Sequence, residues 1–166
     1  MSETRLFPSK TCDGYFGSKR FDRRGTERIH MLFASALLEH SYRLPTLDYH
    51  TLMKLTLALT QSYKEVEKLY HLMCFNVFAH NRDDHAKNFT FLYEPETGWR
   101  LGPACDLTYS NSTGGKHATT IKDLYAVAEA IGLSKETYKH IMEQVHDMFE
   151  DELGDILIRY DKRKSG

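Results

Sequence analysis

The chain has 166 residues, 41% of them hydrophobic and 27% charged, which is ordinary for a single globular domain and argues against a chain that is disordered throughout. Its formal net charge of −1 provides no overall field that would attract nucleic acid or an anionic membrane, so we expect neither as a direct partner. Three cysteines without a CxxC spacing favour reduced thiols, and neither a secretory leader nor an apolar run of membrane-spanning length is evident, so we expect a cytoplasmic protein.

The first sixty residues are interpreted from apolar spacing and turn residues. Residues 1–25 are expected to be irregular. A largely buried helix is predicted over 26–40 and a second helix over 46–60, with Thr46 as a candidate N-cap. A local basic run has two interpretations, a solvated loop or a contact surface for phosphate or a partner; its members are Arg20, Arg23, Arg24 and Arg28.

A third helix is predicted over 62–79, because apolar residues follow the spacing of a helix with one buried face and because Ser62 and Glu65 can form a capping box. Residues 89–93 are then aromatic and β-favouring, and residues 99–101 can return as a second strand after a turn. The sequence therefore predicts a helix, a polar loop and a β-hairpin in succession.

The C-terminal part is predicted to be helical again. Residues 110–117 are small, polar and glycine-bearing, which predicts a loop that is either a simple connector or a regulatory segment. Helices are predicted over 121–131 and 134–153, with Gly132 and Ser134 as stop and cap, and residues 161–166 are expected to fray.

The residues of the polar loop before the hairpin are typical of a phosphoryl-transfer site. Asp83, Asn88 five positions later and Asp106 beyond the hairpin follow the order in which protein kinases present a catalytic carboxylate and two magnesium ligands. Phosphoryl transfer needs a carboxylate that takes or orients the proton of the acceptor hydroxyl, and hard oxygen ligands that hold Mg²⁺ against the nucleotide phosphates. The hairpin would bring Asp106 back beside Asp83.

Around these residues the chain resembles the carboxy-terminal half of HipA-type serine/threonine kinases, which are bacterial toxin–antitoxin kinases. The resemblance is carried by Asn81–Asn88 with Phe89 and Phe91, by Leu101, Pro103, Asp106 and Leu107, by Lys19–Arg23, and by Arg28–Met31. It implies ATP and Mg²⁺ as cofactors, Asp83 as catalytic base, Asn88 and Asp106 as metal ligands, and Lys19 to Asp22 as the hinge beside adenine, with Phe21 as its neighbour. It also implies a hydroxyl on a protein, usually an aminoacyl-tRNA synthetase, as acceptor, and a small DNA-binding antitoxin as partner.

The fold implied by the resemblance is mainly α with a small β-hairpin, a protein-kinase-like C-lobe of the HipA type. Expected divisions are residues 1–25 with the hinge, a helical lobe over 26–160 and a tail over 161–166. Nothing ahead of Lys19 has the form of the phosphate-covering loop or lysine-bearing strand of such kinases, so the N-lobe is expected to be largely absent. We therefore expect at most weak activity from the isolated chain, and a separate amino-terminal kinase fragment as a partner.

Other interpretations of the acidic loop stay open. His85 is expected to hydrogen-bond within the loop and order it, while Lys87 can either screen the carboxylates or reach the transferred phosphoryl group, so both are candidate cofactor-binding residues. Asp84 is expected to face solvent or lie next to phosphate. A metal-dependent phosphohydrolase could use the same region, with a cluster of His80, His85, Asp83, Asp84 and Asp106, although no HExxH motif is present. A non-catalytic module that binds an antitoxin or a partner kinase is the further alternative.

Overall fold

A computed structural model describes residues 2–39, 48–81, 84–107 and 119–150 of the chain. The chain divides into two compact units, each of which contains two stretches of sequence. The first unit comprises Met1–Thr46 and His85–Asp106, and the second comprises Leu47–Asp84 and Leu107–Gly166. The predicted divisions at residues 25 and 160 stay predictions. None of the described helices is long and apolar enough to cross a bilayer.

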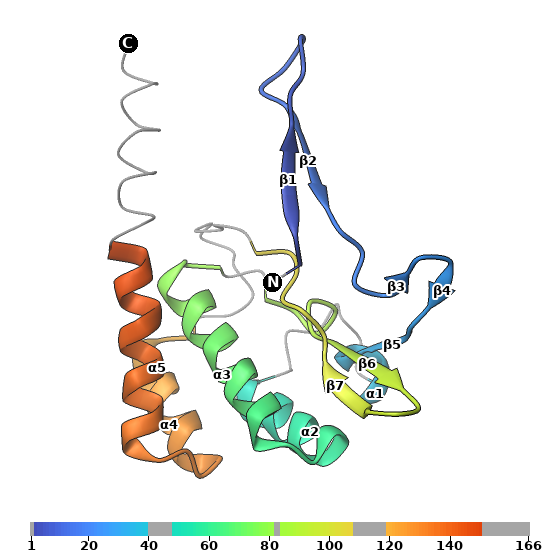
Figure 1. Ribbon diagram of the computed structural model, residues 1–166. Coiled ribbons are helices and arrows are strands. Elements are labelled where there is room, and N and C mark those ends of the chain that lie inside the picture. Colours follow the sequence, from blue (N-terminus) through green and yellow to red (C-terminus); the bar gives the residue numbers. More distant parts are fainter. Residues whose placement is uncertain (1, 40–47, 82–83, 108–118, 151–166) are drawn as a thin grey trace. The chain divides into compact units, whose positions relative to one another are not determined.

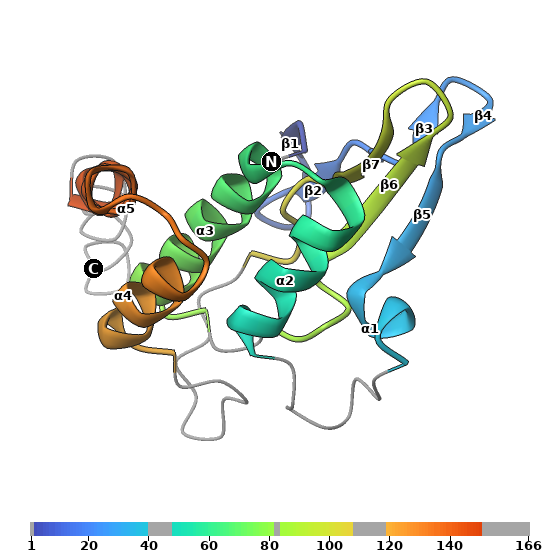
Figure 2. The ribbon, with the colours of Figure 1, turned by 90° about the horizontal axis from the view of Figure 1, so that it is seen from below.

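The first unit is built from antiparallel strands (Figure 1). A long hairpin pairs β1 (Thr4–Phe7) with β2 (Tyr15–Ser18), and a short one pairs β3 (Arg23–Arg24) with β4 (Glu27–Arg28). The third sheet has the order β5–β6–β7, and α1 lies at one end of β5 (Figure 2). Its elements are β5 (His30–Phe33), β6 (Thr90–Glu94), β7 (Gly98–Leu101) and α1 (Ala34–Leu37).

Two predictions for the first forty residues are wrong. Residues 1–25 are not irregular, since strands occupy 4–7 and 15–18, and the helix predicted over 26–40 is replaced by β4, β5 and the four-residue α1. The physical reason is long-range pairing: β5 joins β6 from His30 opposite Tyr93 to Phe33 opposite Thr90. A short, densely apolar run can form a strand or a helix, and the partner strand decides.

The predicted hairpin over 89–101 is confirmed as β6 and β7, paired from Phe91 opposite Leu101 to Glu94 opposite Gly98. Beyond β7 the Gly102 N–H donates to the Thr90 carbonyl at 2.7 Å. A Cβ at position 102 would lie 2.1 Å from Thr90 Oγ1, so only glycine permits this approach.

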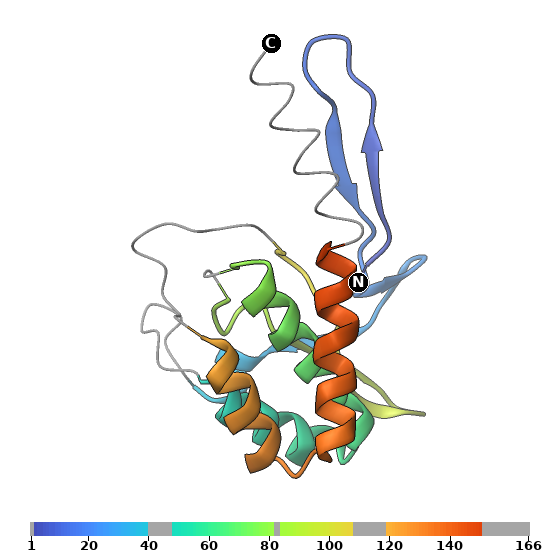
Figure 3. The same cartoon turned by 90° about the vertical axis from the view of Figure 1, so that its left-hand side faces the viewer.

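The second unit is helical, and its predicted helices are confirmed with shifted boundaries. Figure 3, in which α5 faces the viewer, shows α4 and α5 side by side; α3 packs against α2, α4 and α5. Leu69, Tyr70 and Met73 of α3 are fully buried at the centre of this packing. The helices are α2 (Tyr49–Thr60), α3 (Tyr63–Phe78), α4 (Ile121–Ala130) and α5 (Lys135–Met148).

The helix starts differ in part from the prediction. Asp48 caps α2 by accepting from the Thr51 N–H, whereas the candidate cap Thr46 lies outside the described residues, as do the predicted 110–117 loop and the tail. The capping box at Ser62 is wrong: Ser62 makes no side-chain cap bond, and Glu65 pairs with Lys68. Ser134 caps α5 as predicted.

Candidate functional site

The acidic loop begins at a tightly defined helix end. After α3 the His80 N–H donates to the Val77 carbonyl at 3.3 Å and the Asn81 N–H donates to the Asn76 carbonyl at 2.9 Å, the bonding pattern of a Schellman motif. His80 takes the left-handed conformation that this motif requires, with φ +50°. The direction in which the chain leaves α3 is therefore fixed at Asn81. Asp83, the predicted base, lies outside the described residues.

Asp84 is buried, with only 5% of its surface exposed, and its Oδ2 accepts a 2.6 Å hydrogen bond from the Tyr49 hydroxyl. The expectation that Asp84 faces solvent is therefore wrong. Because a buried carboxylate requires hydrogen bonds, Tyr49 of α2 is part of the surroundings of the loop. Burial, and next the charge of Asp84, raises the pKa of the Tyr49 hydroxyl well above its ordinary value, so that it stays protonated and donates.

The remaining loop residues turn toward β6. The Asn88 N–H donates to the His85 carbonyl at 2.8 Å, which closes a tight turn over residues 85–88. The Nδ1 atom of His85 is buried and has no hydrogen-bond partner among the described residues, so the expected ordering bond from this nitrogen is not seen. Lys87 is exposed and Asn88 is half-buried.

One contact joins the segment that carries Asp106 to the turn that carries Asn88. The Cys105 thiol donates to the Asn88 carbonyl oxygen, with 3.4 Å between Sγ and O. Asp106, the next residue, is exposed and has a left-handed backbone, with φ +56°. Burial, and then the charge of Asp106, raises the pKa of the Cys105 thiol. Asp106 therefore directly follows a residue whose side chain contacts the Asn88 backbone.

A cavity of about 300 Å³ lies within the first unit, at the lower end of the range for small-molecule sites, about 300–1,000 Å³. The predicted cofactor-binding residues Lys19 and Phe21 both line it. We call this cavity the hinge pocket; its lining residues are Ser18, Lys19, Arg20, Phe21 and Asp22 before β3, Met31 and Phe33 of β5, Thr90 of β6, and Cys105. The pocket is therefore lined both by the predicted hinge and by Cys105, the residue before Asp106.

Thr90 is a polar residue in the wall of the hinge pocket. It is only 2% exposed, and its hydroxyl has no hydrogen-bond partner among the residues that the structure describes. A buried hydroxyl without a partner is destabilising by about 1–3 kcal/mol.

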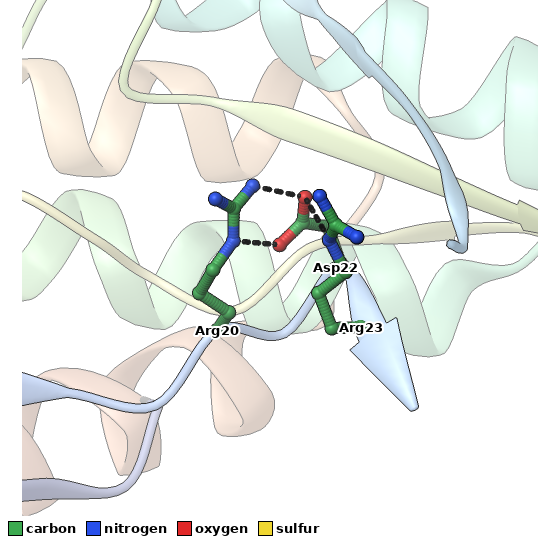
Figure 4. A network of polar contacts seen from close by, with 3 residues as sticks. All are labelled: Arg20, Asp22 and Arg23. Atoms are coloured by element: carbon green, nitrogen blue, oxygen red, sulfur yellow. Dashed lines mark hydrogen bonds and ion pairs between the residues drawn. The ribbon is translucent and has the colours of Figure 1, made fainter. Parts of the chain in front are cut away.

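The Asp22 carboxylate at the hinge pocket is paired with two arginines (Figure 4). Arg20 makes a bidentate contact with Asp22: its Nε donates to Oδ1 at 2.8 Å and its Nη2 donates to Oδ2. The Nε of Arg23 lies 4.0 Å from Oδ2 of the same carboxylate. The hydrogen bonds from Arg20 lower the pKa of Asp22. Lys19 instead extends its ammonium group to Glu3 at 3.0 Å, with both side chains exposed.

Several residues around the site were missed in the sequence. Met31 and Phe33 lie on one face of β5 because they are two residues apart, a signal that the helical interpretation hid. Asn76 stands on the buried face of α3 at helical spacing from Leu69 and Met73, and a polar residue in such a stripe signals a buried hydrogen-bond network. Thr90 and Cys105 carried no such signal.

The side chains that could coordinate a metal ion suit a hard divalent cation such as Mg²⁺ only in part. No group of three or more His, Cys, Asp or Glu side chains placed to hold a metal ion occurs in the stretches 2–39, 48–81, 84–107 and 119–150. Asn88 and Asp106 nevertheless offer an amide oxygen and a carboxylate, which are the oxygen ligands that Mg²⁺ accepts together with water and substrate phosphates.

Comparison with known proteins defines the relationship of this chain. Its fold is similar to that of HipA in the complex of the Shewanella oneidensis MR-1 toxin–antitoxin proteins HipA and HipB with operator DNA, with a TM-score of 0.72 and 16% sequence identity. That match covers 95% of this chain and 46% of the HipA chain, so this chain spans less than half of that protein. No curated protein matches. The family model of the HipA-like C-terminal domain matches residues 1–153, and the chain therefore belongs to the family of HipA-like C-terminal domains.

Proposed function

We propose that this chain is the nucleotide- and magnesium-binding lobe of a serine/threonine kinase that acts as the toxin of a toxin–antitoxin system. The observation that carries the proposal is the Cys105–Asn88 contact at 3.4 Å, because Cys105 also lines the hinge pocket and is followed by Asp106. A nucleotide base in the pocket would then have its phosphates directed toward the two candidate metal ligands. Family membership supports the same proposal.

The residues present fit the two cofactors. Phe21, Met31 and Phe33 give the hinge pocket apolar walls suited to a planar base, and the Thr90 hydroxyl offers a polar group that has no other partner among the described residues.

In the proposed reaction Asn88 and Asp106 would hold the metal ion with their side-chain oxygens. Asp83 would accept the proton of the acceptor hydroxyl as its oxygen bonds to the γ-phosphorus of ATP and ADP leaves. Bound Mg²⁺ supplies charge neutralisation on the nucleotide phosphates. Phe21 and Thr90 orient the base, and Asp22, held ionised by Arg20, keeps the pocket edge polar. The acceptor is proposed to be a hydroxyl on a protein, an aminoacyl-tRNA synthetase being the usual acceptor of the resembling kinases.

Alkylation of cysteine tests the pocket without requiring catalysis. Cys105 lines the hinge pocket, whereas Cys12 is exposed and its thiol pKa is lowered by the hydrogen bond with Ser9 and then by that with Gly14. We expect ATP to slow the modification of Cys105 by iodoacetamide about tenfold at 100 times its dissociation constant or above, and to leave Cys12 unchanged. Mass spectrometry of tryptic peptides gives both rates from one sample.

The control for this experiment is Phe21→Ala, which removes one wall of the hinge pocket and is expected to abolish the protection of Cys105. Equal modification of Cys105 with and without ATP, in a chain that remains folded, would show that the pocket does not take the nucleotide.

A non-catalytic interaction module is the second candidate, favoured by the β1–β2 hairpin. Its paired apolar side chains are exposed, Leu6 by 64% and the opposite Phe16 by 74%. A two-stranded hairpin is only marginally stable by itself, so a covering partner such as an antitoxin or a separate amino-terminal kinase fragment would stabilise it. Absence of nucleotide protection at Cys105 would favour this candidate.

A further inference from the structure

A chain of buried side-chain hydrogen bonds crosses the second unit and has both ends in the acidic loop. Asn81 Nδ2 donates to Asn76 Oδ1 at 3.1 Å, Asn76 Nδ2 donates to the Tyr49 hydroxyl oxygen at 2.9 Å, and Tyr49 donates to Asp84 Oδ2 at 2.6 Å. All four residues are buried, with 5–8% of their surface exposed. Tyr49 belongs to α2 and Asn76 to α3, so two helices supply the middle of the network.

The direction of every hydrogen bond in this network follows from the carboxylate at its end, Asp84. The Tyr49 hydroxyl donates to Asp84, so its oxygen is left to accept from the Asn76 amide nitrogen. The Asn76 oxygen then faces Asn81, whose amide must donate. Only this set of directions keeps all three bonds, and reversing any one of them would break a buried hydrogen bond.

The ends of the network lie on either side of Asp83. Asn81 precedes residues 82–83 and Asp84 follows them, while the Asn81 backbone is also held on the Asn76 carbonyl at 2.9 Å. Asn81 is thus attached to α3 through Asn76, and Asp84 is attached to α2 through Tyr49.

Stability alone is a poor explanation for this arrangement. Replacing a buried polar network with apolar side chains of similar volume is often neutral or stabilising, so such networks are better understood as devices that select one conformation. Here the network holds Asn81 and Asp84, the two described residues that precede and follow residues 82–83.

We propose that Tyr49 and Asn76 are positioning residues, which act through Asp84 and Asn81 to fix the backbone on both sides of Asp83. The inference rests on the proposed function for its catalytic meaning, but the fixing of the segment can be measured in the absence of any reaction.

The test uses two matched variants of the full chain. Tyr49→Phe removes the hydroxyl that joins Asn76 to Asp84. Tyr70→Phe removes another hydroxyl of the same unit, that of a fully buried tyrosine which donates to the Leu124 carbonyl at 3.1 Å. Both changes delete one buried oxygen, but only the first affects the network.

Hydrogen–deuterium exchange of backbone amides is the first measurement. Because hydrogen bonds to charged groups contribute about 1.5–3 kcal/mol, Tyr49→Phe should accelerate exchange in a peptide covering residues 79–87 by roughly tenfold or more. Tyr70→Phe should leave that peptide unchanged at a similar loss of melting temperature. Asn76→Leu, which has a similar volume and no polar atom, should reproduce the acceleration.

The second measurement is phosphoryl transfer, with the chain supplied with its amino-terminal fragment where transfer requires one. Tyr49→Phe should lower kcat about tenfold with little change in the KM for ATP, whereas Tyr70→Phe should leave both unchanged. Accelerated exchange without any transfer in the wild type would count against the proposed kinase and support the positioning. Equal exchange at 79–87 in wild type and Tyr49→Phe would overturn the positioning, whatever the kinase result.

Discussion

At the scale of single residues, the most informative positions are those where the backbone takes a left-handed conformation. Glycine adopts this conformation freely, whereas for other residues it costs about 1–2 kcal/mol, with Asn and Asp the least affected. Four residues other than glycine have it in the described chain, namely Glu39, Gln61, His80 and Asp106. His80 and Asp106 flank the candidate site in sequence, and strain of this kind is commonly retained where a side chain must be placed.

The free-energy cost of a left-handed residue can be measured at the C-terminal ends of α2 and α4, by introducing a glycine at one and removing a glycine from the other. Gln61 caps α2 with φ +51°, and Gly132 follows α4 with φ +75° in open space, where an added Cβ would meet nothing within 4 Å. We expect Gln61→Gly to raise the free energy of unfolding by about 1 kcal/mol and Gly132→Ala to lower it by about 1 kcal/mol. Urea unfolding followed by circular dichroism gives both values, and changes of the same sign would contradict the argument.

At the scale of elements, the sequence predicted the parts whose structure depends on local signals. α3, α4 and α5 have regular apolar spacing, and β6 and β7 are separated by turn residues, so all were predicted within a few residues. β5 was mistaken for a helix because its pairing with β6 joins residues about sixty positions apart. Thr90, Met31 and Phe33 reach the hinge pocket only through that sheet, so no local pattern could have identified them.

The start of α4 gives a pH-dependent prediction. The Asp123 carboxylate accepts from the N–H and the hydroxyl of Thr120, each at 2.7 Å, and the hydrogen bond from the Thr120 side chain, followed by that from its backbone, lowers the pKa of Asp123. Its folded pKa is below the unfolded value of about 3.9, so the stabilisation is complete above that pH and is lost as the pH falls through the lower, folded value.

Asp123→Asn should therefore lower the free energy of unfolding by about 1 kcal/mol at pH 7 and reduce the loss of melting temperature between pH 5 and pH 3. Glu129→Gln, which changes an exposed carboxylate of the same helix, is the control. Thermal melts of the three proteins across this range provide the comparison, and parallel curves for wild type and Asp123→Asn would rule out the capping contribution.

At the scale of the whole molecule, the family resemblance seen around Asn88 and Asp106 is confirmed by the family assignment, while the phosphoryl-transfer roles of Asp83, Asn88 and Asp106 stay predictions. What the sequence could not provide was the buried network of Tyr49, Asn76, Asn81 and Asp84, because side-chain partners on different helices are set by tertiary packing. The family could thus be recognised from local residues, whereas the network could not.

The proposed function predicts a stabilising effect of ATP with Mg²⁺ on the whole chain. Ligand at 100 times its dissociation constant contributes about 2.7 kcal/mol, which corresponds to a rise in melting temperature of roughly 5–10 °C. Asp106→Asn should abolish the rise, because an amide is a weaker Mg²⁺ ligand than a carboxylate. Since asparagine also tolerates the left-handed backbone found at 106, the substitution should leave the fold intact.

Asp13→Asn, an exposed carboxylate in the loop between β1 and β2, is the matched control for this measurement and should keep the full rise. Equal rises in Asp106→Asn and wild type would remove Asp106 from the metal site while leaving nucleotide binding in place.

The glycine that follows β7 has a consequence that reaches beyond the hairpin. At position 102 the side chain is a single hydrogen atom, and an added methyl carbon would lie 2.1 Å from Thr90 Oγ1. Three residues later the chain reaches Cys105, and one further on Asp106. A methyl group at position 102 would thus displace either Thr90, which lines the hinge pocket, or the segment that leads to Cys105 and Asp106. A single substitution there is therefore expected to disturb both the hinge pocket and the position of the proposed metal ligand.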